Sequence, residues 1–262
     1  MGQTIGPHQN QKKPMKIALI ADIHANFPAL QTVLADAAKQ KVDLIWNLGD
    51  FVGHTPFPEE VAGTLRALKI PSIVGNYDLK VLDFPKNAKK WKKEKGSVKF
   101  FSFAWTYKQL SAKSKKYLRS LPQELRLKLG GKKFLLVHGS PAAIDDPLAV
   151  DTPQKKFLEL SRQAKADVVL CGHTHRYFIR RAGGVVFINP GSVGRPFDGN
   201  LKTSYAIISL VGKKMKVINR RLGYPVAKTL AKMVQENFPT GLIESIALGR
   251  SMDDLKKILN KV

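Results

Sequence analysis

Residues 16–24 read KIALIADIH, and this stretch decides the fold that we expect for the chain. Its first part, Lys16–Ala21, is a short apolar run rich in strand-forming residues, which is typical of a buried strand. Asp22 and His24 follow directly, so two potential metal ligands stand at the carboxyl end of that strand. In an open α/β sheet, binding sites form at this edge. The stretch therefore predicts both a central strand and a site at its end.

The residues that follow predict a β-α-β-α-β order. We expect a helix from about Pro28 to Gln40, a strand at Asp43–Leu48, a helix from about Pro58 to Leu68 and a third strand at Pro71–Val74. This alternation implies parallel strands with helices on their faces. Farther along the chain, glycine-containing turns predict antiparallel hairpins at Gly130-Gly131, Gly183-Gly184 and Val211–Lys213. We therefore expect an α/β fold, a two-sheet β-sandwich flanked by helices in an α-β-β-α arrangement.

The length of 262 residues is enough for one substantial core. We expect a single domain over residues 15–262, with a basic helical insert at about 86–121 and C-terminal helices at about 225–262, specifically 225–236 and 252–260. Residues 1–14 contain no apolar run, so we expect a flexible tail there and not a signal peptide or an anchor.

The formal net charge is +24, from 44 Lys and Arg against 20 Asp and Glu. Such a charge attracts polyanions over a long range, so nucleic acid is a candidate partner. In the basic insert, Trp91 and nearby phenylalanines among lysines either stack on nucleic acid or form the underside of a helix pair, and we favour the second interpretation.

Cys171 is the one cysteine, which excludes an intramolecular disulfide. Together with the lack of a bilayer-length apolar stretch, it predicts a cytoplasmic protein that does not enter a membrane. Whether the chain forms a homo-oligomer is left open.

Potential metal ligands follow five predicted strands. They lie in Asp22-Ile23-His24, Gly49-Asp50, Gly75-Asn76-Tyr77-Asp78, His138-Gly139 and Gly172-His173-Thr174-His175. A lone histidine at a strand end is more often a satisfied polar side chain than a ligand, but that explanation does not account for four histidines together with two aspartates and an asparagine. Carboxylate oxygens and imidazole nitrogens suit Mn, Fe, Zn or Ni better than Ca.

The order D-x-H, G-D, G-N-x-D, H-G and G-H-x-H resembles that of the calcineurin-like metallophosphoesterase superfamily. The stretches GDFVGHTPFP, GNYDLKVL, LLVHGSP, LCGHTHR and INPGSVGRP resemble its small bacterial and archaeal phosphodiesterase branch. The resemblance runs from about Lys16 to Leu210. It implies two divalent transition-metal ions, with Mn expected first and Fe, Ni or Zn as alternatives.

By this resemblance, one ion takes Asp22, His24 and His175, the other takes Asn76, His138 and His173, and Asp50 bridges them. A carboxylate has two oxygens and can bridge ions that lie about 3.5–4 Å apart. The resemblance implies hydrolysis of phosphodiester bonds, and also of phosphomonoesters, in nucleotides or related small molecules by a metal-bridging hydroxide. Asn76 is then a catalytic residue as well as a ligand.

One position departs from the family pattern. Many members have a histidine after the asparagine, where it protonates the leaving oxygen, and here that residue is Tyr77. The ordinary pKa of tyrosine, near ~10, is poorly matched to neutral pH. We therefore expect either Tyr77 to contact substrate or His54 to act as the acid or as a phosphate contact. The alternative is that His54 is a loop histidine outside the site.

Two further residues carry open alternatives. Asn26 either contacts the substrate phosphate or caps the helix that starts near Pro28. Arg195 either faces the site and binds substrate or lies in solvent. The alternatives to a phosphodiesterase are a nuclease that acts on DNA or RNA, which the net charge favours, and a metal-binding scaffold or interaction protein with little catalysis.

Overall fold

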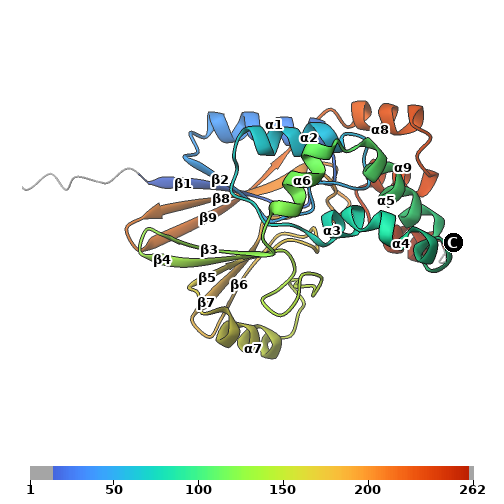
Figure 1. The fold of residues 1–262 in the computed structure, drawn as a ribbon. Helices are drawn as coiled ribbons and strands as arrows, with labels where there is room; N and C mark the ends of the chain where they lie inside the picture. The colour runs from blue at the N-terminus through green and yellow to red at the C-terminus, as the bar shows by residue number, and fades with distance from the viewer. Residues whose placement is uncertain (1–13, 260–262) are drawn as a thin grey trace, which may run out of the picture.

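The structure is a computed structural model that describes residues 14–259 (Figure 1). The expected tail at residues 1–14 lies outside the described residues except for Pro14. Two β-sheets pack face to face, with helices outside them (Figure 1), which confirms the predicted two-sheet α/β sandwich. Within the described range, no helix combines the length and the apolar character that crossing a membrane requires.

The first sheet has the strand order β2-β1-β8-β9. Its strands are β1 (Met15–Ile20), β2 (Leu44–Asn47), β8 (Thr203–Val211) and β9 (Lys214–Leu222). β1 runs parallel to β2 and antiparallel to β8, with Ile17 opposite Leu44 on one side and Ile208 on the other. The parallel pair is connected by the helix α1 (Phe27–Lys39), because parallel strands need a crossover connection.

The second sheet has the order β3-β4-β5-β7-β6. Its strands are β3 (Glu124–Leu129), β4 (Lys132–Val137), β5 (Val168–Leu170), β6 (Phe178–Ala182) and β7 (Val185–Asn189). β4, β5 and β7 are parallel, and the outer strands are antiparallel to them. The helix α7 (Gln154–Ala164) lies on the outer face of this sheet (Figure 1).

Strand β1 is buried on both faces, which explains its continuous apolar sequence. Ile17 and Leu19 point into the core between the sheets, whereas Ala18 and Ile20 face the layer that contains α1 and the helix α2 (Pro58–Ala67). Alternate residues of a strand point to opposite faces, so one short segment contributes to both cores. The strand is thereby fixed, and so are the residues at its carboxyl end.

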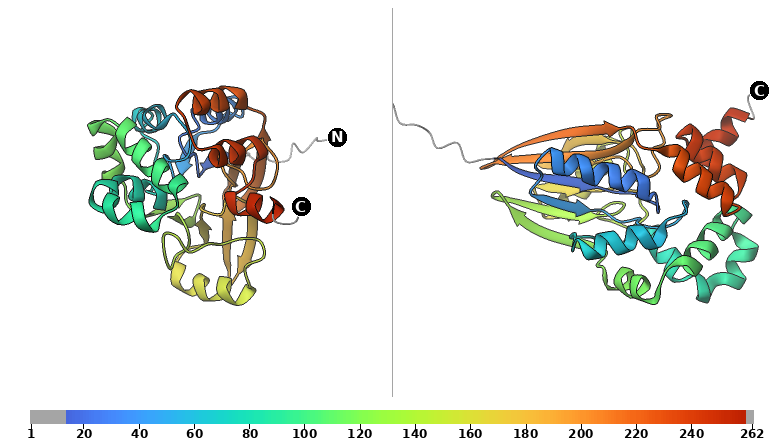
Figure 2. Two further views of the ribbon diagram at one scale, coloured as in Figure 1. Left: turned by 90° about the vertical axis from the view of Figure 1, so that its right-hand side faces the viewer. Right: turned by 90° about the horizontal axis from the view of Figure 1, so that it is seen from above.

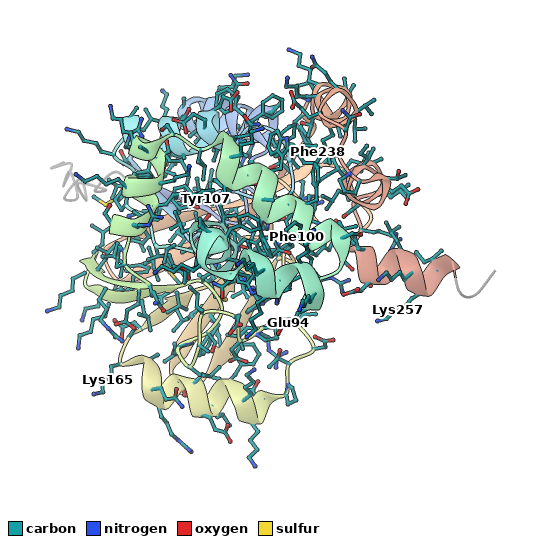
Figure 3. The ribbon with its side chains drawn as sticks, turned by 45° about the vertical axis from the view of Figure 1, so that its right-hand side comes forward. Glu94, Phe100, Tyr107, Lys165, Phe238 and Lys257 are labelled. Atoms are coloured by element: carbon teal, nitrogen blue, oxygen red, sulfur yellow. The ribbon has the colours of Figure 1, made fainter. Side chains whose placement is uncertain are left out.

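The remaining helices gather at one end of the sandwich (Figure 2). They are α3 (Asn76–Leu82), α4 (Phe84–Glu94), α5 (Ser97–Gln109), α6 (Ala112–Ser120), α8 (Val226–Gln235), α9 (Thr240–Leu248) and α10 (Met252–Leu259). Phe101 and Trp105 of α5 pack edge-on against Phe238, which is labelled in Figure 3, with ring centroids 5.1 and 4.8 Å apart. This apolar contact joins the helical insert to the C-terminal helices.

Three expectations about the elements need correction. Pro71–Val74 is not a strand but a single bridge between Asn47 and Ser72, because Val74 N donates to Pro122 O and not to a sheet neighbour. The helical insert begins at Asn76, ten residues earlier than expected. The two expected C-terminal helices do not include α9, which ends at Gly249 in the left-handed conformation.

Candidate metal centre

The carboxyl ends of four strands meet where the helices cover the sandwich. β1 is followed by Asp22 and His24, β2 by Asp50, β4 by His138, and β5 by His173 and His175. Asn76, the first residue of α3, joins them. All seven predicted ligands therefore lie together.

The backbone is strained at most of these positions. Positive φ angles of 48° to 72° occur at Asp22, His24, Asp50, His54, His173 and His175. A non-glycine residue in this region costs roughly 1–3 kcal/mol, and such costs persist where the surrounding structure dictates the conformation. Here each strained residue follows a buried strand end that holds it in place. Strain of this kind clusters at functional sites.

Asp22, His24 and His175 form one group whose ligand atoms lie within 4.8 Å of one another. His24 Nε2 lies 3.1 Å from His175 Nε2, and Asp22 Oδ1 lies 3.5 Å from His175 Nε2. All three side chains are buried. Buried carboxylate and imidazole groups at these separations can hold one metal ion.

The second group surrounds His138. Its Nε2 lies 3.3 Å from Asp50 Oδ2 and 2.9 Å from Asn76 Oδ1. Asn76 Oδ1 is also 3.0 Å from His173 Nδ1. Asp50 Oδ2 lies 3.6 Å from His24 Nε2, so this carboxylate faces both groups.

Backbone carbonyls orient three of the imidazole rings. The Nδ1 atoms of His24, His138 and His175 lie 3.3, 2.7 and 2.6 Å from the carbonyl oxygens of Val52, Leu48 and Arg195. A carbonyl can only accept, so each Nδ1 carries a proton. Burial lowers the pKa values of His24 and His175, so these two rings are neutral and turn an Nε2 lone pair toward the site. The two Nε2 atoms of His24 and His175 then face each other as acceptors, an arrangement that fits a cation among them.

Burial and mutual charge shift the pKa values of the site. Burial raises the pKa of Asp22 to about 8. Burial alone would lower the pKa of His138, but the Asp50 carboxylate beside it raises that pKa to about 10. A divalent cation among these groups would keep the carboxylates ionised and the imidazoles neutral, because metal ligands bind in their deprotonated forms.

Asp78 and Gly75 hold the Asp50 loop in place. Asp78 accepts hydrogen bonds from Gly75 N at 2.9 Å and Val52 N at 3.1 Å, and Asp50 Oδ1 accepts one from Tyr77 N at 2.7 Å. A Cβ atom at Gly75 would overlap the carboxylate and the backbone nitrogen of Asp50. The loop therefore requires glycine at this position.

A cavity of about 500 Å³ opens onto the metal centre. Its wall includes His54, Tyr77 and Arg195, together with Phe197 and the first turns of α5 and α10. The ring centroids of His54 and Tyr77 lie 4.2 Å apart, and those of His54 and His24 lie 4.9 Å apart. His54 therefore lines the cavity beside the metal centre.

The pKa values of His54 and Tyr77 differ from those of the free side chains. Burial, followed by the charge of Arg195, lowers the pKa of His54 well below its usual range. Burial raises the pKa of Tyr77 to about 12. His54 Nδ1 is buried and has no hydrogen-bond partner among the described residues. The imidazole is therefore a neutral group available to a ligand in the cavity.

Arg195 lies in the wall of the cavity and is only 6% exposed, so the alternative of a solvent-exposed arginine is excluded. Its Nη2 donates to Ser245 Oγ at 3.0 Å, and its guanidinium carbon lies 5.0 Å from the centre of the Phe197 ring. Its Nε is buried without a partner among the described residues. Burial lowers the pKa of Arg195 to about 10, so the side chain stays charged at neutral pH.

Asn26 caps α1 and does not line the cavity. Its Oδ1 accepts from Ala29 N at 3.4 Å and from Thr229 Oγ1 at 3.0 Å, and its Nδ2 donates to Gly194 O at 2.9 Å and to Tyr224 Oη at 3.0 Å. The side chain is fully buried and its hydrogen-bonding groups are used. The expected contact between Asn26 and substrate is therefore wrong, and the cap is correct.

Comparisons with known proteins identify the family to which this chain is similar. The family model described as the calcineurin-like phosphoesterase superfamily domain matches residues 15–213. An uncharacterized protein of Methanocaldococcus jannaschii is 32% identical over 251 residues, which cover 89% of this chain and 98% of that protein. Phosphodiesterase YfcE of Escherichia coli is 25% identical over 208 residues, which cover 74% of this chain and 87% of YfcE.

Two solved structures are also similar to this chain. The crystal structure of a metallophosphoesterase from Sphaerobacter thermophilus has a TM-score of 0.74 and 30% identity, and covers 90% of this chain and 99% of its own. A hypothetical protein from Pyrococcus horikoshii has a TM-score of 0.83 at 24% identity, with 90% of this chain and all of that chain covered, which shows the same fold.

Proposed function

The chain belongs to the calcineurin-like phosphoesterase superfamily and is a phosphoric ester hydrolase, and we propose that it hydrolyses phosphodiesters of nucleotides or related small molecules with two divalent metal ions. The observation that carries this proposal is the position of the Asp50 carboxylate between histidines of the two groups. Asp50 Oδ2 is within 3.6 Å of His24 Nε2 and within 3.3 Å of His138 Nε2.

We assign the ligands to two ions as follows. One ion would be held by Asp22, His24 and His175 and the other by Asn76, His138 and His173, and both would share Asp50. Mn is the ion we propose, with Fe, Ni or Zn as alternatives, because mixed oxygen and imidazole donors suit these metals. Asn76 contributes a neutral oxygen and so leaves the site more cationic than a third carboxylate would.

When bound, two divalent ions activate a water molecule as the nucleophile at neutral pH and neutralise charge on the phosphate. The protein's own residues orient the ligands and exclude bulk water. Carbonyl groups fix the rings of His24, His138 and His175, and the buried wall of the cavity lowers the local dielectric, which strengthens electrostatic contacts with a bound phosphate.

We propose that His54, Tyr77 and Arg195 contact the substrate. His54 offers a buried Nδ1 that has no protein partner, and Tyr77 lies beside it with its hydroxyl protonated at neutral pH. Both can therefore donate a hydrogen bond to an ester oxygen. Arg195 brings a buried positive charge to the same cavity.

The direct test is turnover of bis(4-nitrophenyl) phosphate, from which hydrolysis releases 4-nitrophenolate. After treatment with EDTA and dialysis, we expect activity to return on addition of Mn and to be lost in the variant His175→Ala. Lys155→Gln, a change of an exposed lysine on α7, should behave as the wild type. No metal-stimulated turnover by the wild-type protein would refute the proposal.

A nuclease is the second candidate, and the charge distribution favours it. The net charge is +24, and α4 carries five lysines and buries none of its residues. An exposed basic helix can bind a phosphate backbone, with an affinity that falls steeply as salt rises. Cleavage of single-stranded DNA or RNA at physiological salt would support this function, and lack of cleavage with retained turnover of small diesters would exclude it.

A further inference from the structure

Two helices from distant parts of the chain complete the cavity beside the metal centre. The first turn of α5 contributes Gly96–Lys99, and α10 contributes Ser251–Asp253 and Lys256. Both helices lie at the same end of the sandwich (Figure 2). α10 is outside the residues 15–213 that the family model matches.

This part of the wall is positively charged. Lys99, Lys256 and Arg195 line it, against the single carboxylate of Asp253. The first turn of α5 adds to the charge, because a helix N-terminus presents free N–H groups and the positive end of the helix dipole. Its N-cap residue is Gly96, which has no side chain to accept bonds from these groups.

Arg195 provides independent evidence for an anionic ligand. Its side chain is more than nine-tenths buried, its Nε has no partner, and it forms no ion pair within 4.0 Å among residues 14–259. A buried cation without a counter-charge is costly, and such costs are relieved when an anion binds. Arg195, Lys99 and Lys256 line one cavity, so an anion bound there would be attracted by all three positive charges.

The aromatic rings of the cavity are already engaged by the protein. Phe197 is stacked on His175 with centroids 4.1 Å apart and planes at 8°, and it also contacts Arg195. Tyr77 packs against His54 and Phe103. A nucleobase would therefore find little ring surface on which to stack, so charge is the stronger basis for recognition.

We propose that the first turn of α5, Lys256 of α10 and Arg195 form a binding site for a second phosphate group of the substrate. The preferred substrates are then phosphodiesters that carry a further phosphate on the part of the molecule away from the ester that is cleaved. This inference rests on the proposed function, because the metal centre provides the site for the first phosphate.

The test uses two substrates that differ only in the second phosphate. They are thymidine 5′-(4-nitrophenyl phosphate) and its 3′-phosphorylated form. We expect the wild-type enzyme to favour the 3′-phosphorylated form in kcat/KM by about tenfold, which is what one charge-assisted hydrogen bond supplies. Lys99→Gln and Lys256→Gln should each reduce this preference, and the double variant should reduce it further.

Lys257→Gln is the matched control. Lys257 is the next residue of the same helix, is exposed, and does not line the cavity (Figure 3). The variant removes the same charge from α10 and should keep the wild-type preference. Equal losses in Lys256→Gln and Lys257→Gln would show a general charge effect and overturn the proposal. An absence of preference in an active wild-type enzyme would also overturn it, while leaving the phosphodiesterase function intact.

A binding measurement separates this inference from catalysis. Titration calorimetry of the EDTA-treated protein compares thymidine 3′,5′-bisphosphate with thymidine 5′-monophosphate. We expect tighter binding of the bisphosphate, and a smaller difference in Lys99→Gln and Lys256→Gln than in Lys257→Gln. Equal binding of the two ligands by the wild-type protein would refute the second phosphate site even if no substrate were turned over.

Discussion

The Nε2 atoms of His24 and His175 lie 3.1 Å apart, and neither carries a proton, because each ring is neutral and donates its Nδ1–H to a backbone carbonyl. Two acceptors at this distance repel each other unless a positive charge lies close to both. The rings come from the ends of different strands, β1 and β5, so the fold itself brings the two lone pairs together. The fold therefore keeps the two lone pairs close together, and a bound cation would relieve their repulsion.

Binding of Mn should accordingly raise the stability of the protein. A ligand at a hundred times its dissociation constant adds about 2.7 kcal/mol to the free energy of unfolding. Scanning calorimetry in EDTA and in excess Mn should show this as a rise in Tm. His175→Ala should show a much smaller rise, and Lys155→Gln the full one. A wild-type Tm that does not respond to Mn, Fe, Ni or Zn would contradict the prediction.

Gly75→Ala should disrupt the same site by a steric route. The added methyl group would overlap the backbone nitrogen of Asp50 as well as its carboxylate, and a change of rotamer cannot relieve a clash with backbone. We expect a loss of about 1–3 kcal/mol in the free energy of unfolding, as for overpacked cores. Calorimetric titration should also show weaker Mn binding.

Gly63→Ala is the control for that substitution. Gly63 lies inside α2, and a Cβ atom there would meet nothing within 4 Å. Alanine is the better helix former by up to about 1 kcal/mol, so this variant should be slightly more stable than the wild type. If both alanines had the same effect, the close approach of Gly75 to Asp50 would not explain the loss.

The clustering of the candidate ligands could be predicted because their signal is local. All except Asn76 closely follow an apolar strand, and the ends of neighbouring strands must meet, so Asp22 and His175 are placed by the fold although 153 positions separate them along the chain. By contrast, Pro71–Val74 is as apolar as a short strand, and only the hydrogen bond from Val74 N to Pro122 O shows that it leaves the sheet.

The second phosphate site could not be predicted in this way. Lys99 and Lys256 are exposed lysines among many, and their common cavity depends on the packing of Phe101 and Trp105 against Phe238. Asn26 shows the same limitation. Its sequence context fits a cap and a phosphate contact equally, and only its burial decides between them.

The role of His54 can be tested by comparing leaving groups. A hydrogen bond to the phosphate would help every diester, whereas a general acid matters most where the leaving group is poor. Because His54 is neutral and buried next to Arg195, we expect His54→Ala to lower kcat/KM by about tenfold for both bis(4-nitrophenyl) phosphate and a thymidine dinucleotide. A loss confined to the dinucleotide would identify His54 as the acid, and full activity on both would remove it from the site.

Asp36 should make the stability depend on pH outside the metal centre. This carboxylate on α1 accepts hydrogen bonds from Arg220 of β9, with Nη2 to Oδ1 at 2.9 Å, and from Tyr205 of β8. Burial alone would raise the pKa of Asp36, but the bonds from Arg220 and Tyr205 outweigh it and lower the pKa. The group therefore stabilises the fold above its unfolded pKa near ~3.9, and the contribution is lost as the pH falls through the lower folded value.

Asp36→Asn should thus cost about 1–3 kcal/mol at pH 7, as expected for charge-assisted hydrogen bonds. Urea unfolding in EDTA, from pH 7 down to the acid limit of the folded protein, should show the wild type and the variant converging below about pH 4, where the free carboxyl takes up its proton. The titration of the metal ligands is common to both proteins and cancels in the difference.

Asp151→Asn is the control, because the exposed carboxyl of Asp151 makes no hydrogen bond or ion pair to the described residues. This variant should stay within about 0.5 kcal/mol of the wild type throughout. A difference for Asp36→Asn that does not change with pH would mean that the ionised carboxylate contributes nothing beyond its neutral contacts.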